Sequence, residues 1–283
     1  IGENPQPMLG QISIPSNSTA TNNGSRSNSG KNAGFTYEVD RDDDPTEILP
    51  CTDADYDCSL RSAIVKANED GNSSQITFAG HRWIILANRL PDVSDANTTF
   101  VAKDDQEVHV DGNNLSAHVF RITGPQTIIN GLRIYGAGAG FSNIVITESA
   151  YDVTIKNNII GDGDSPPGHC GSSENTYAGI YVDAQGYNGD SARAWIFGNT
   201  IECINGSPGE GIVVFTDKVI IGLDNQWKSG DHAVNVIQFN RGFGVNLNRT
   251  TGNTITGNKI LNNQAGTIFS SNVDNNIMFN DFD

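Results

Sequence analysis

"NTITGNKILNN", residues 253–263, sets asparagines between isoleucines, and the same pattern returns elsewhere in the chain. "VTIKNNIIG" begins at residue 153, "WIFGNTIEC" at 195 and "NIMFNDFD" at 276. The apolar and asparagine positions coincide in all four copies, which align as Ile155-x-x-Asn158-x-Ile160, Ile196-x-x-Asn199-x-Ile201, Ile255-x-x-Asn258-x-Ile260 and Ile277-x-x-Asn280-x-Phe282. The chain therefore contains an internal repeat.

A second phrase alternates with the first: "GIYV" begins at residue 179, "GIVV" at 211, "GVNL" at 244 and "GTIF" at 266. The last copies lie about 22 residues apart, and fixed periods of this size are typical of solenoids. Each coil of a parallel β-helix has this length and buries its apolar residues against the coils on either side. We predict an all-β, single-stranded parallel β-helix, with the hairpin turns of a β-sandwich as the alternative.

Asparagine suits the corners of such coils because it tolerates left-handed and bridging backbone conformations and its amide bonds the local backbone. Amides that recur at one corner can also stack along the axis of the solenoid. We predict a structural ladder at one corner that consists of Asn158, Asn199, Asn258 and Asn280.

The chain has 283 residues and a formal net charge of -16 at pH 7. Its 17 lysines and arginines are scattered, whereas phosphate binding needs them clustered, so nucleic acid is not expected as a partner. A local basic groove can coexist with an acidic whole, so acidic glycans stay open as ligands. No run of 18 apolar residues is present, and no membrane span is predicted.

Four cysteines fall as a close pair, Cys51 and Cys58, and a distant pair, Cys170 and Cys203, without the spacing of a zinc site. We predict two disulfides, with four buried thiols as the alternative, and disulfides place a protein outside a reducing cytosol. The first residue, Ile1, fits a mature chain whose export signal has been removed. An extracellular or cell-surface location is therefore expected.

Three regions differ in composition. Residues 1–34 are rich in Ser, Asn and Gly and are expected to form an extended arm. Residues 35–75 are expected to hold a disulfide loop and a short capping α-helix that starts at Ser59 and ends at Gly71. Residues 76–283 are expected to form the β-helix.

The text "CSLRSAIVKAN", which begins at Cys58, is followed by "ITFAG", "WIILANRLPDV" and "VHVDGNN". Together these resemble the N-terminal CSLREA-type segment of secreted bacterial β-helix proteins, with Ser62 where that motif has Glu. The downstream repeats look like those of right-handed parallel β-helices in surface proteins, carbohydrate-binding proteins and sugar hydrolases. The resemblance implies an exported right-handed β-helix whose first coil is covered by the short helix, and it names no reaction.

Asp53, Asp55 and Asp57 alternate in "TDADYDC" like the first ligands of a calcium loop, because hard oxygen donors at that spacing can converge on one ion. The glycine and the terminal glutamate of such loops do not follow at the proper positions. Calcium is therefore one candidate cofactor, and a solvated acidic loop held by the cysteines is the alternative.

No catalytic residue is predicted. The bases near strand phrases that a lyase would need are Arg133, Lys156 and Arg193. The carboxylates that a glycoside hydrolase would need are Asp183, Glu202, Glu210 and Asp217. The sequence around the three candidate bases does not match the motifs of pectate lyases. The four candidate carboxylates include no adjacent pair within the repeat phrases.

Aromatic residues gather in or beside the longest insertion, where they could stack on sugars or simply cover an edge of the core. These candidates for glycan binding are Tyr177, Tyr181, Tyr187 and Trp195. Asn-x-Ser/Thr sequons make six asparagines candidates for glycosylation. They are Asn17, Asn23, Asn72, Asn97, Asn114 and Asn248.

Our leading hypothesis is a non-enzymatic extracellular protein with a structural or adhesive role. The sequence stops within a repeat phrase, so we expect self-association through coil ends and the N-terminal arm into a homo-oligomer, fibre or surface assembly. The alternatives are a carbohydrate-active β-helix, either a polysaccharide lyase or a glycoside hydrolase, and a glycan-binding module without turnover.

Overall fold

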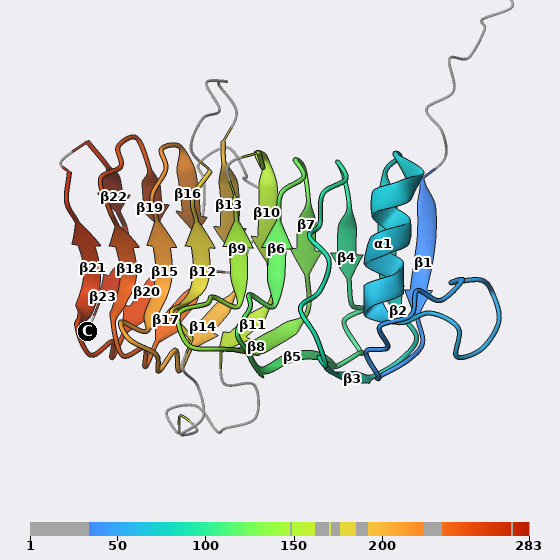
Figure 1. Ribbon diagram of the computed structural model, residues 1–283. Coiled ribbons are helices and arrows are strands. Elements are labelled where there is room, and N and C mark those ends of the chain that lie inside the picture. The colour runs from blue at the N-terminus through green and yellow to red at the C-terminus, as the bar shows by residue number, and fades with distance from the viewer. Residues whose placement is uncertain are drawn as a thin grey trace, which may run out of the picture. The chain divides into compact units, whose positions relative to one another are not determined.

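The chain winds through three parallel sheets, called A, B and C below, and successive coils add one strand after another to each sheet (Figure 1). The predicted all-β parallel β-helix is confirmed. The computed structural model describes residues 34–147, 149–161, 170, 176–184, 192–222, 234–272 and 274–282. Residues 1–33, which make up almost all of the predicted arm, lie outside the described residues.

Every strand pairs with its neighbours in parallel. Sheet A contains, in spatial order, β1 (Phe35–Val39), β2 (Ser74–Phe78), β4 (Thr99–Val101), β7 (Ile128–Asn130), β10 (Val153–Lys156), β13 (Ala194–Phe197), β16 (Val219–Gly222), β19 (Thr254–Thr256) and β22 (Asn276–Met278). Sheet B contains β3 (Arg82–Ile85), β5 (Val108–Leu115), β8 (Arg133–Ala137), β11 (Ile159–Gly161), β14 (Thr200–Glu202), β17 (Val236–Gln238), β20 (Lys259–Leu261) and β23 (Asp281–Phe282). Sheet C contains β6 (Phe120–Ile122), β9 (Ile144–Ile146), β12 (Ala178–Val182), β15 (Glu210–Val214), β18 (Phe243–Leu247) and β21 (Gly266–Ser270).

Inward-facing aliphatic and aromatic residues stack in columns along the solenoid, one rung per coil. The column of sheet A is Ile76, Phe100, Ile129, Ile155, Ile196, Ile221, Ile255 and Ile277. The column of sheet B is Ile84, Val110, Ile134, Ile160, Ile201, Ile237, Ile260 and Phe282. All members before the last described coil are fully buried, whereas Ile277 and Phe282 are exposed. Each rung therefore depends on its neighbours for burial.

The four asparagines of the predicted ladder lie at the corner between sheets A and B. Asn158 Nδ2 donates to Asn199 Oδ1 over 3.0 Å, and Asn258 Nδ2 donates to Asn280 Oδ1 over 2.8 Å. The side chains of Asn158, Asn199 and Asn258 are buried. Because an unpaired buried amide is costly, these hydrogen bonds hold the coils in one register.

Asn235, which the repeat pattern missed, completes the ladder. It accepts from Asn199 Nδ2 at 3.0 Å and donates its own Nδ2 to Asn258 Oδ1 at 2.8 Å. The sheet A isoleucine of its coil is Ile221, and thirteen residues separate Ile221 from Asn235 where the other copies have two, so the spacing of the pattern is broken there. The amide position alone was not a sufficient signal in an asparagine-rich chain.

The C-terminal coils carry amide ladders at the other two corners as well. Between sheets B and C, Asn240 Nδ2 donates to Asn263 Oδ1 over 2.9 Å. Between sheets C and A, Asn253 Nδ2 donates to Asn275 Oδ1 over 3.0 Å. Three separate corners therefore use the same side chain to satisfy backbone groups that the sheets leave unpaired.

The helix α1 (Leu60–Asp70) begins after Ser59, whose side chain accepts from Ser62 N at 3.2 Å, and it ends at Gly71 with a φ of 63°. Ser62 Oγ also accepts from Leu49 N at 2.8 Å. The position that holds Glu in the CSLREA-type motif is thus occupied here by a small, buried, hydrogen-bonded serine. Among the described residues, no helix is long and apolar enough to cross a membrane.

The helix packs against β1 and β2 at the first coil (Figure 1). β1 pairs with β2 over its whole length, so the region predicted as loop and helix also supplies the first strand of sheet A. This strand has no counterpart in the repeat phrases, because "FTYEV" lacks their isoleucine and asparagine positions.

The acidic run "DRDDD", residues 40–44, has a structural role at its last residue. Asp44 is buried and accepts from Arg61 Nε and Nη2, each over 2.7 Å. Its carboxylate also accepts from Ala87 N at 3.0 Å and Asn88 N at 3.1 Å. A buried charge needs such full compensation, so this cluster fixes the helix to the loop that follows β3.

Removal of a central ladder amide should destabilise the fold. Asn199 Nδ2 donates to Ile155 O, Phe197 O and Asn235 Oδ1, so Asn199→Ala leaves several buried groups without a partner. We expect a loss of roughly 2–4 kcal/mol in the free energy of unfolding, measured by urea denaturation. Asn88→Ala, at an exposed asparagine, should change it by less than about 0.5 kcal/mol. Equal losses in both variants would contradict a structural ladder.

Candidate functional site

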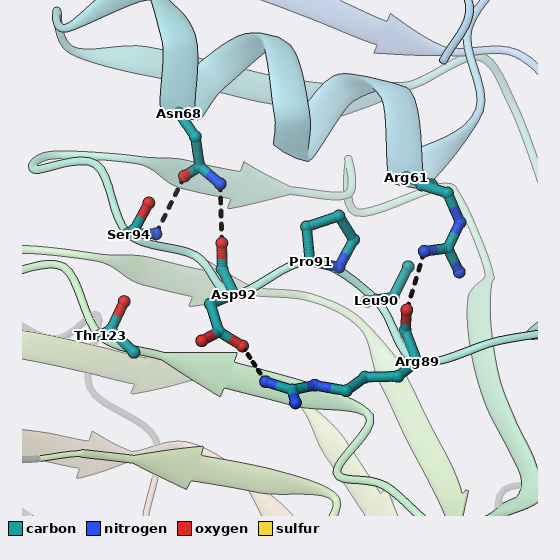
Figure 2. A pocket seen from close by; sticks show the side chains of 8 residues that line it. All are labelled: Arg61, Asn68, Arg89, Leu90, Pro91, Asp92, Ser94 and Thr123. Carbon is teal, nitrogen blue, oxygen red and sulfur yellow. Dashed lines mark hydrogen bonds and ion pairs between the residues drawn. The ribbon is translucent and has the colours of Figure 1, made fainter. Parts of the chain in front are cut away.

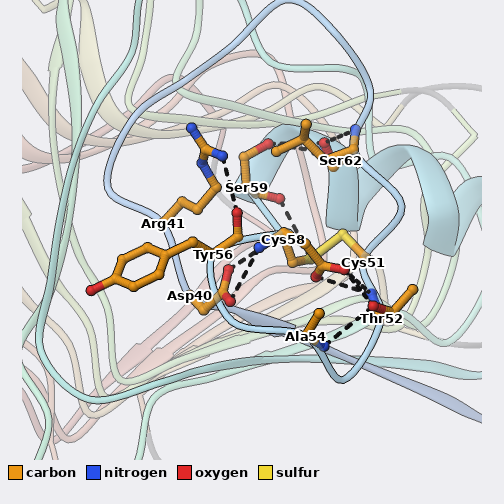
Figure 3. The surroundings of a disulfide bond; sticks show 11 residues. Asp40, Arg41, Cys51, Thr52, Ala54, Tyr56, Cys58, Ser59 and Ser62 are labelled. Atoms are coloured by element: carbon orange, nitrogen blue, oxygen red, sulfur yellow. Dashed lines mark hydrogen bonds between the residues drawn. A yellow bond between two sulfur atoms is a disulfide. The ribbon is translucent and has the colours of Figure 1, made fainter.

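The two cysteine pairs that the spacing predicts are bonded, as Cys51–Cys58 and Cys170–Cys203. Figure 3 shows the first of them beside the start of α1. Asp40 accepts from Cys58 N at 2.9 Å and thereby ties the small disulfide loop to the end of β1. Disulfides at both places support a chain that folds in an oxidising compartment.

The structure does not gather Asp53, Asp55 and Asp57 into a metal site. Asp57 accepts from Thr52 N at 3.0 Å and also contacts the Thr52 hydroxyl, while Asp53 and Asp55 are exposed. Within the described ranges, no group of three or more His, Cys, Asp or Glu side chains is placed to hold a metal ion. The alternation that suggested calcium is instead used to close the disulfide loop through Asp57.

Two of the four predicted aromatic residues lie together on the outer face of sheet C. The ring centroids of Tyr177 and Tyr181 are 5.8 Å apart, and those of Tyr181 and Phe215 are 5.5 Å apart. Trp195 lies elsewhere, on β13 of sheet A, and Tyr187 lies outside the described residues. Phe215, which the sequence analysis missed, follows β15 directly, one coil after Tyr181.

The outer face of sheet C carries its side chains in register. Arg121, Val145, Tyr181, Val213, Asn246 and Phe269 form one outward column, from β6 to β21. Phe269 also pairs with Phe243, at 5.3 Å between ring centroids. Val145 and Val213 within this column are buried, whereas its other members are at least partly exposed. We call the outer side of sheet C from Arg121 to Phe269, with Tyr177 and Phe215, face C. It combines aromatic rings with polar groups, as recognition surfaces do.

The tyrosines of face C stay protonated over a wide pH range. Burial, followed by the nearby charge of Asp183, raises the pKa of Tyr181 to about 12. Burial and the charge of Glu210 raise the pKa of Tyr177 above its ordinary value of 10.0. At neutral pH both hydroxyl groups can therefore donate a hydrogen bond to a ligand.

Glu210 lies at the start of β15, 4% exposed, and joins two coils of face C. Its carboxylate accepts from Phe243 N at 2.5 Å and from Asn246 Nδ2 at 3.2 Å. Burial raises the pKa of Glu210 although both hydrogen bonds oppose the rise. This carboxylate therefore stabilises the junction of β15 and β18 at an electrostatic cost.

The other residues considered for catalysis are dispersed. Glu202 accepts from Gln238 Nε2 at 2.9 Å on sheet B, and Asp217 accepts from Thr251 N at 2.7 Å beyond the end of β15. The candidate bases are Arg133 on sheet B, and Lys156 and Arg193 on or beside sheet A. Asp183, directly after β12, is the candidate carboxylate that lies with Glu210 near the tyrosines of face C. The other candidate acids and bases lie on different sheets of the described chain.

A groove of about 540 Å³ lies at the N-terminal end of face C, between α1 and the loop that leads into the second coil (Figure 2). It is lined by Arg61, Asn68, Arg89, Leu90, Pro91, Asp92, Ser94 and Thr123. Figure 2 shows Asn68 reaching from the helix to this loop: Nδ2 donates to Asp92 O at 2.7 Å, and Oδ1 accepts from Ser94 N at 2.9 Å. The groove therefore has a fixed shape.

The predicted glycosylation sites differ in accessibility. Asn97 and Asn114 are exposed, whereas Asn72 and Asn248 are half-buried. The amide of Asn72 also donates to a backbone carbonyl at 2.7 Å. Two further sequons lie outside the described residues, Asn17 and Asn23.

Comparison of the chain with protein-family models, with curated proteins and with solved structures found no match. The CSLREA-type resemblance therefore stays a prediction from the sequence. Any function has to be argued from the geometry of face C and its groove.

Glu210 should make stability depend on pH in a defined direction. A carboxyl whose pKa is raised by folding contributes stability that is fully present below its ordinary pKa of 4.5 and is lost as the pH rises through the folded value. We expect Glu210→Gln to gain stability relative to the native chain as the pH rises from about 4 to about 7. Urea denaturation across this range measures the difference.

Glu47→Gln, at an exposed glutamate, is the matched control for this pH series. Its stability relative to the native chain should not vary with pH. A difference for Glu210→Gln that is equally flat would contradict the burial of a charged carboxylate at this junction.

Proposed function

We propose that the chain is a non-enzymatic extracellular adhesive protein, a rigid β-helix that binds carbohydrate through face C. The observation that carries the proposal is the cluster of Tyr177, Tyr181 and Phe215 on neighbouring coils of one sheet. Aromatic rings offer a broad apolar surface at low cost in side-chain entropy, and the tyrosine hydroxyl groups add hydrogen bonds.

The β-helix presents these rings on two successive coils, Tyr177 and Tyr181 on one and Phe215 on the next. Successive strands of a sheet lie about 4.8 Å apart, so the six strands of sheet C extend along the axis for roughly 24 Å. A linear polysaccharide could contact several rungs at once. Each further contact is then intramolecular, which raises the overall affinity without a deep pocket.

The extracellular location is supported by the two disulfides, which persist in oxidising compartments. Lysine and arginine number 17, against 33 aspartates and glutamates, and the net charge is -16. This composition favours a soluble surface over binding to nucleic acid. An adhesive role follows from a binding surface on a rigid scaffold without an assigned set of catalytic groups.

Tyr181→Ala should weaken binding to polysaccharides. Loss of one aromatic contact is worth about 1 kcal/mol, or roughly a fivefold increase in Kd. Affinity electrophoresis and calorimetry against a panel of soluble polysaccharides measure the effect. Trp195→Ala is the matched control, because this ring lies on sheet A, and it should leave Kd unchanged.

The same panel separates binding from turnover. Incubation with each polysaccharide should release neither unsaturated products nor new reducing ends. Release of either would favour a lyase or a hydrolase over an adhesive protein. Equal effects of the two aromatic substitutions would contradict the assignment of face C.

A second proposed role, self-association, is favoured by the coil of β21, β22 and β23. Ile277 and Phe282 continue the core columns of sheets A and B, yet they are 38% and 46% exposed. Phe279 beside them is 84% exposed. Large exposed apolar groups and unpaired strand edges together are typical of an interface.

Self-association of the 283-residue chain should therefore depend on this coil. Analytical ultracentrifugation should detect concentration-dependent oligomers of the native chain, and Ile277→Asp with Phe282→Asp should shift them to monomer. Ile85→Asp, at an exposed isoleucine on the outer face of sheet B, should not change the distribution. A native chain that is monomeric at every concentration would contradict this role.

A further inference from the structure

A cluster of three charged side chains lies at the groove at the N-terminal end of face C: Arg89 and Asp92 line the groove, and Arg121 lies beside it. Arg89 Nη2 and Arg121 Nη1 both contact the carboxylate of Asp92, one on each of its oxygens. Two cations thus share one anion, which leaves an excess of one positive charge. The side chains of Arg89 and Arg121 are 57% and 36% exposed, so this charge is accessible to a ligand.

Each guanidinium keeps donors for another partner. A guanidinium group has five N–H donors in a planar fork, and a single nitrogen of Arg89 and of Arg121 is directed at Asp92. The shared carboxylate restrains both side chains, which reduces the entropy lost when a ligand binds. The planar forks match a carboxylate in a bidentate manner.

His118 adds a neutral donor near the two arginines. Its Nδ1 accepts from Ser142 N at 3.0 Å, which leaves the proton of the neutral ring on Nε2. Burial lowers the pKa of His118 foremost, and the charges of Arg121 and Arg89 lower it further. The hydrogen bond to Ser142 and the charge of Asp92 oppose this shift, and burial decides its direction, so the neutral ring is favoured.

Arg61, the other arginine that lines the groove, is not available to a ligand. It is buried, with two nitrogens on Asp44, and it donates to Asn88 O at 2.9 Å and to Arg89 O at 2.8 Å. Arg61 therefore forms part of the wall, as Figure 2 shows for its contact with Arg89. The cations left for a ligand are Arg89, in the loop that lines the groove, and Arg121 of β6, which contacts the groove residue Asp92.

We propose that this groove binds the carboxylate of an acidic sugar residue, a uronate, through Arg89 and Arg121. This inference rests on the proposed function of face C and names the class of glycan. Leu90 and Pro91 line the same groove and offer apolar contact to the sugar ring, while Ser94 and Thr123 offer hydroxyl groups. Such a mixture of apolar and polar groups is typical of small-molecule sites.

The register connects the groove to the tyrosines. Arg121 pairs with Val145, and Val145 pairs with Tyr181, so two strand spacings separate the cation from the aromatic ring. This distance is about 10 Å. A polymer that lies along the axis can therefore place one sugar ring on Tyr181 and a charged residue further along the chain at Arg121.

The net charge of -16 does not rule out such a ligand. Charges separated by more than about 8 Å are largely screened at physiological salt, so the groups next to the ligand dominate. Arg89 and Arg121 are those groups, and the affinity should fall as salt is added. A neutral glycan would bind through the rings of face C without this dependence.

The test compares three uronate polymers, polygalacturonate, alginate and hyaluronan, with their methyl-esterified forms, which keep the sugar rings but remove the charge. We expect at least one of the three to bind the native chain at least tenfold more tightly than its ester, because charge-assisted hydrogen bonds are lost in the ester. Arg89→Gln and Arg121→Gln should each reduce this preference to less than about threefold. Arg249→Gln, at an exposed arginine outside the groove, should keep it.

Each outcome has a separate meaning. Binding that depends on Tyr181 but is equal for acid and ester would overturn the uronate site and leave the proposed function standing. A preference that survives Arg89→Gln and Arg121→Gln would also overturn the site. Absence of binding to any acidic or neutral glycan would overturn both proposals. Circular dichroism of the Gln variants confirms that they fold, and Arg89→Gln, at the more exposed position, is the variant least able to disturb the core.

Discussion

Buried asparagine amides at the coil corners are the interaction on which the rest of the structure depends. At a corner the chain leaves one sheet before it enters the next, and its backbone N–H groups lose their strand partners. Asn158 N donates to Asn199 Oδ1 at 3.0 Å, and Asn199 N donates to Asn235 Oδ1 at 2.9 Å. Each amide therefore satisfies the backbone of the preceding coil. A slip of one residue would leave these groups buried and unpaired, so the ladder specifies the register.

This register determines what the outer surfaces can do. Because the corners fix the register of successive coils, each outward side chain lies beside the outward side chain of the next coil. The outer surface therefore consists of columns of side chains that run along the axis. On sheet C the column runs from Arg121 through Tyr181 to Phe269. Residues far apart in the sequence thereby form one continuous face. A scaffold of this kind needs no flexible loop to place a cation about 10 Å from an aromatic ring.

The fold could be predicted from the sequence because its signals are local and repeated. The coils from β10 onward repeat their isoleucines and a corner asparagine, mostly at short spacing. Asn235 was missed because thirteen residues separate it from Ile221, the isoleucine of its coil. The site could be predicted only in part. Tyr181 and Trp195 are close in sequence, yet they belong to different sheets, because consecutive strands β12 and β13 enter sheets C and A in turn. Arg121 contacts the groove residue Asp92, 29 residues earlier, which no local pattern encodes.

If the exposed fraction of aromatic side chains were the only criterion, the outer face of sheet B would be chosen as the glycan-binding surface instead of face C. Trp83 is 48% exposed and lies flat on His109, with ring centroids 4.0 Å apart and an angle of 9° between the planes. Its column continues with Arg133 and Ile159, so sheet B offers a ligand one accessible aromatic ring there. A polymer gains more from several moderately exposed rings, because every contact after the first is intramolecular. Edge strand β3 is also occupied on its outer side, where Trp83 N donates to an aspartate at 3.1 Å. The clustered rings of face C are therefore better suited to a linear glycan than the most exposed indole in the described chain.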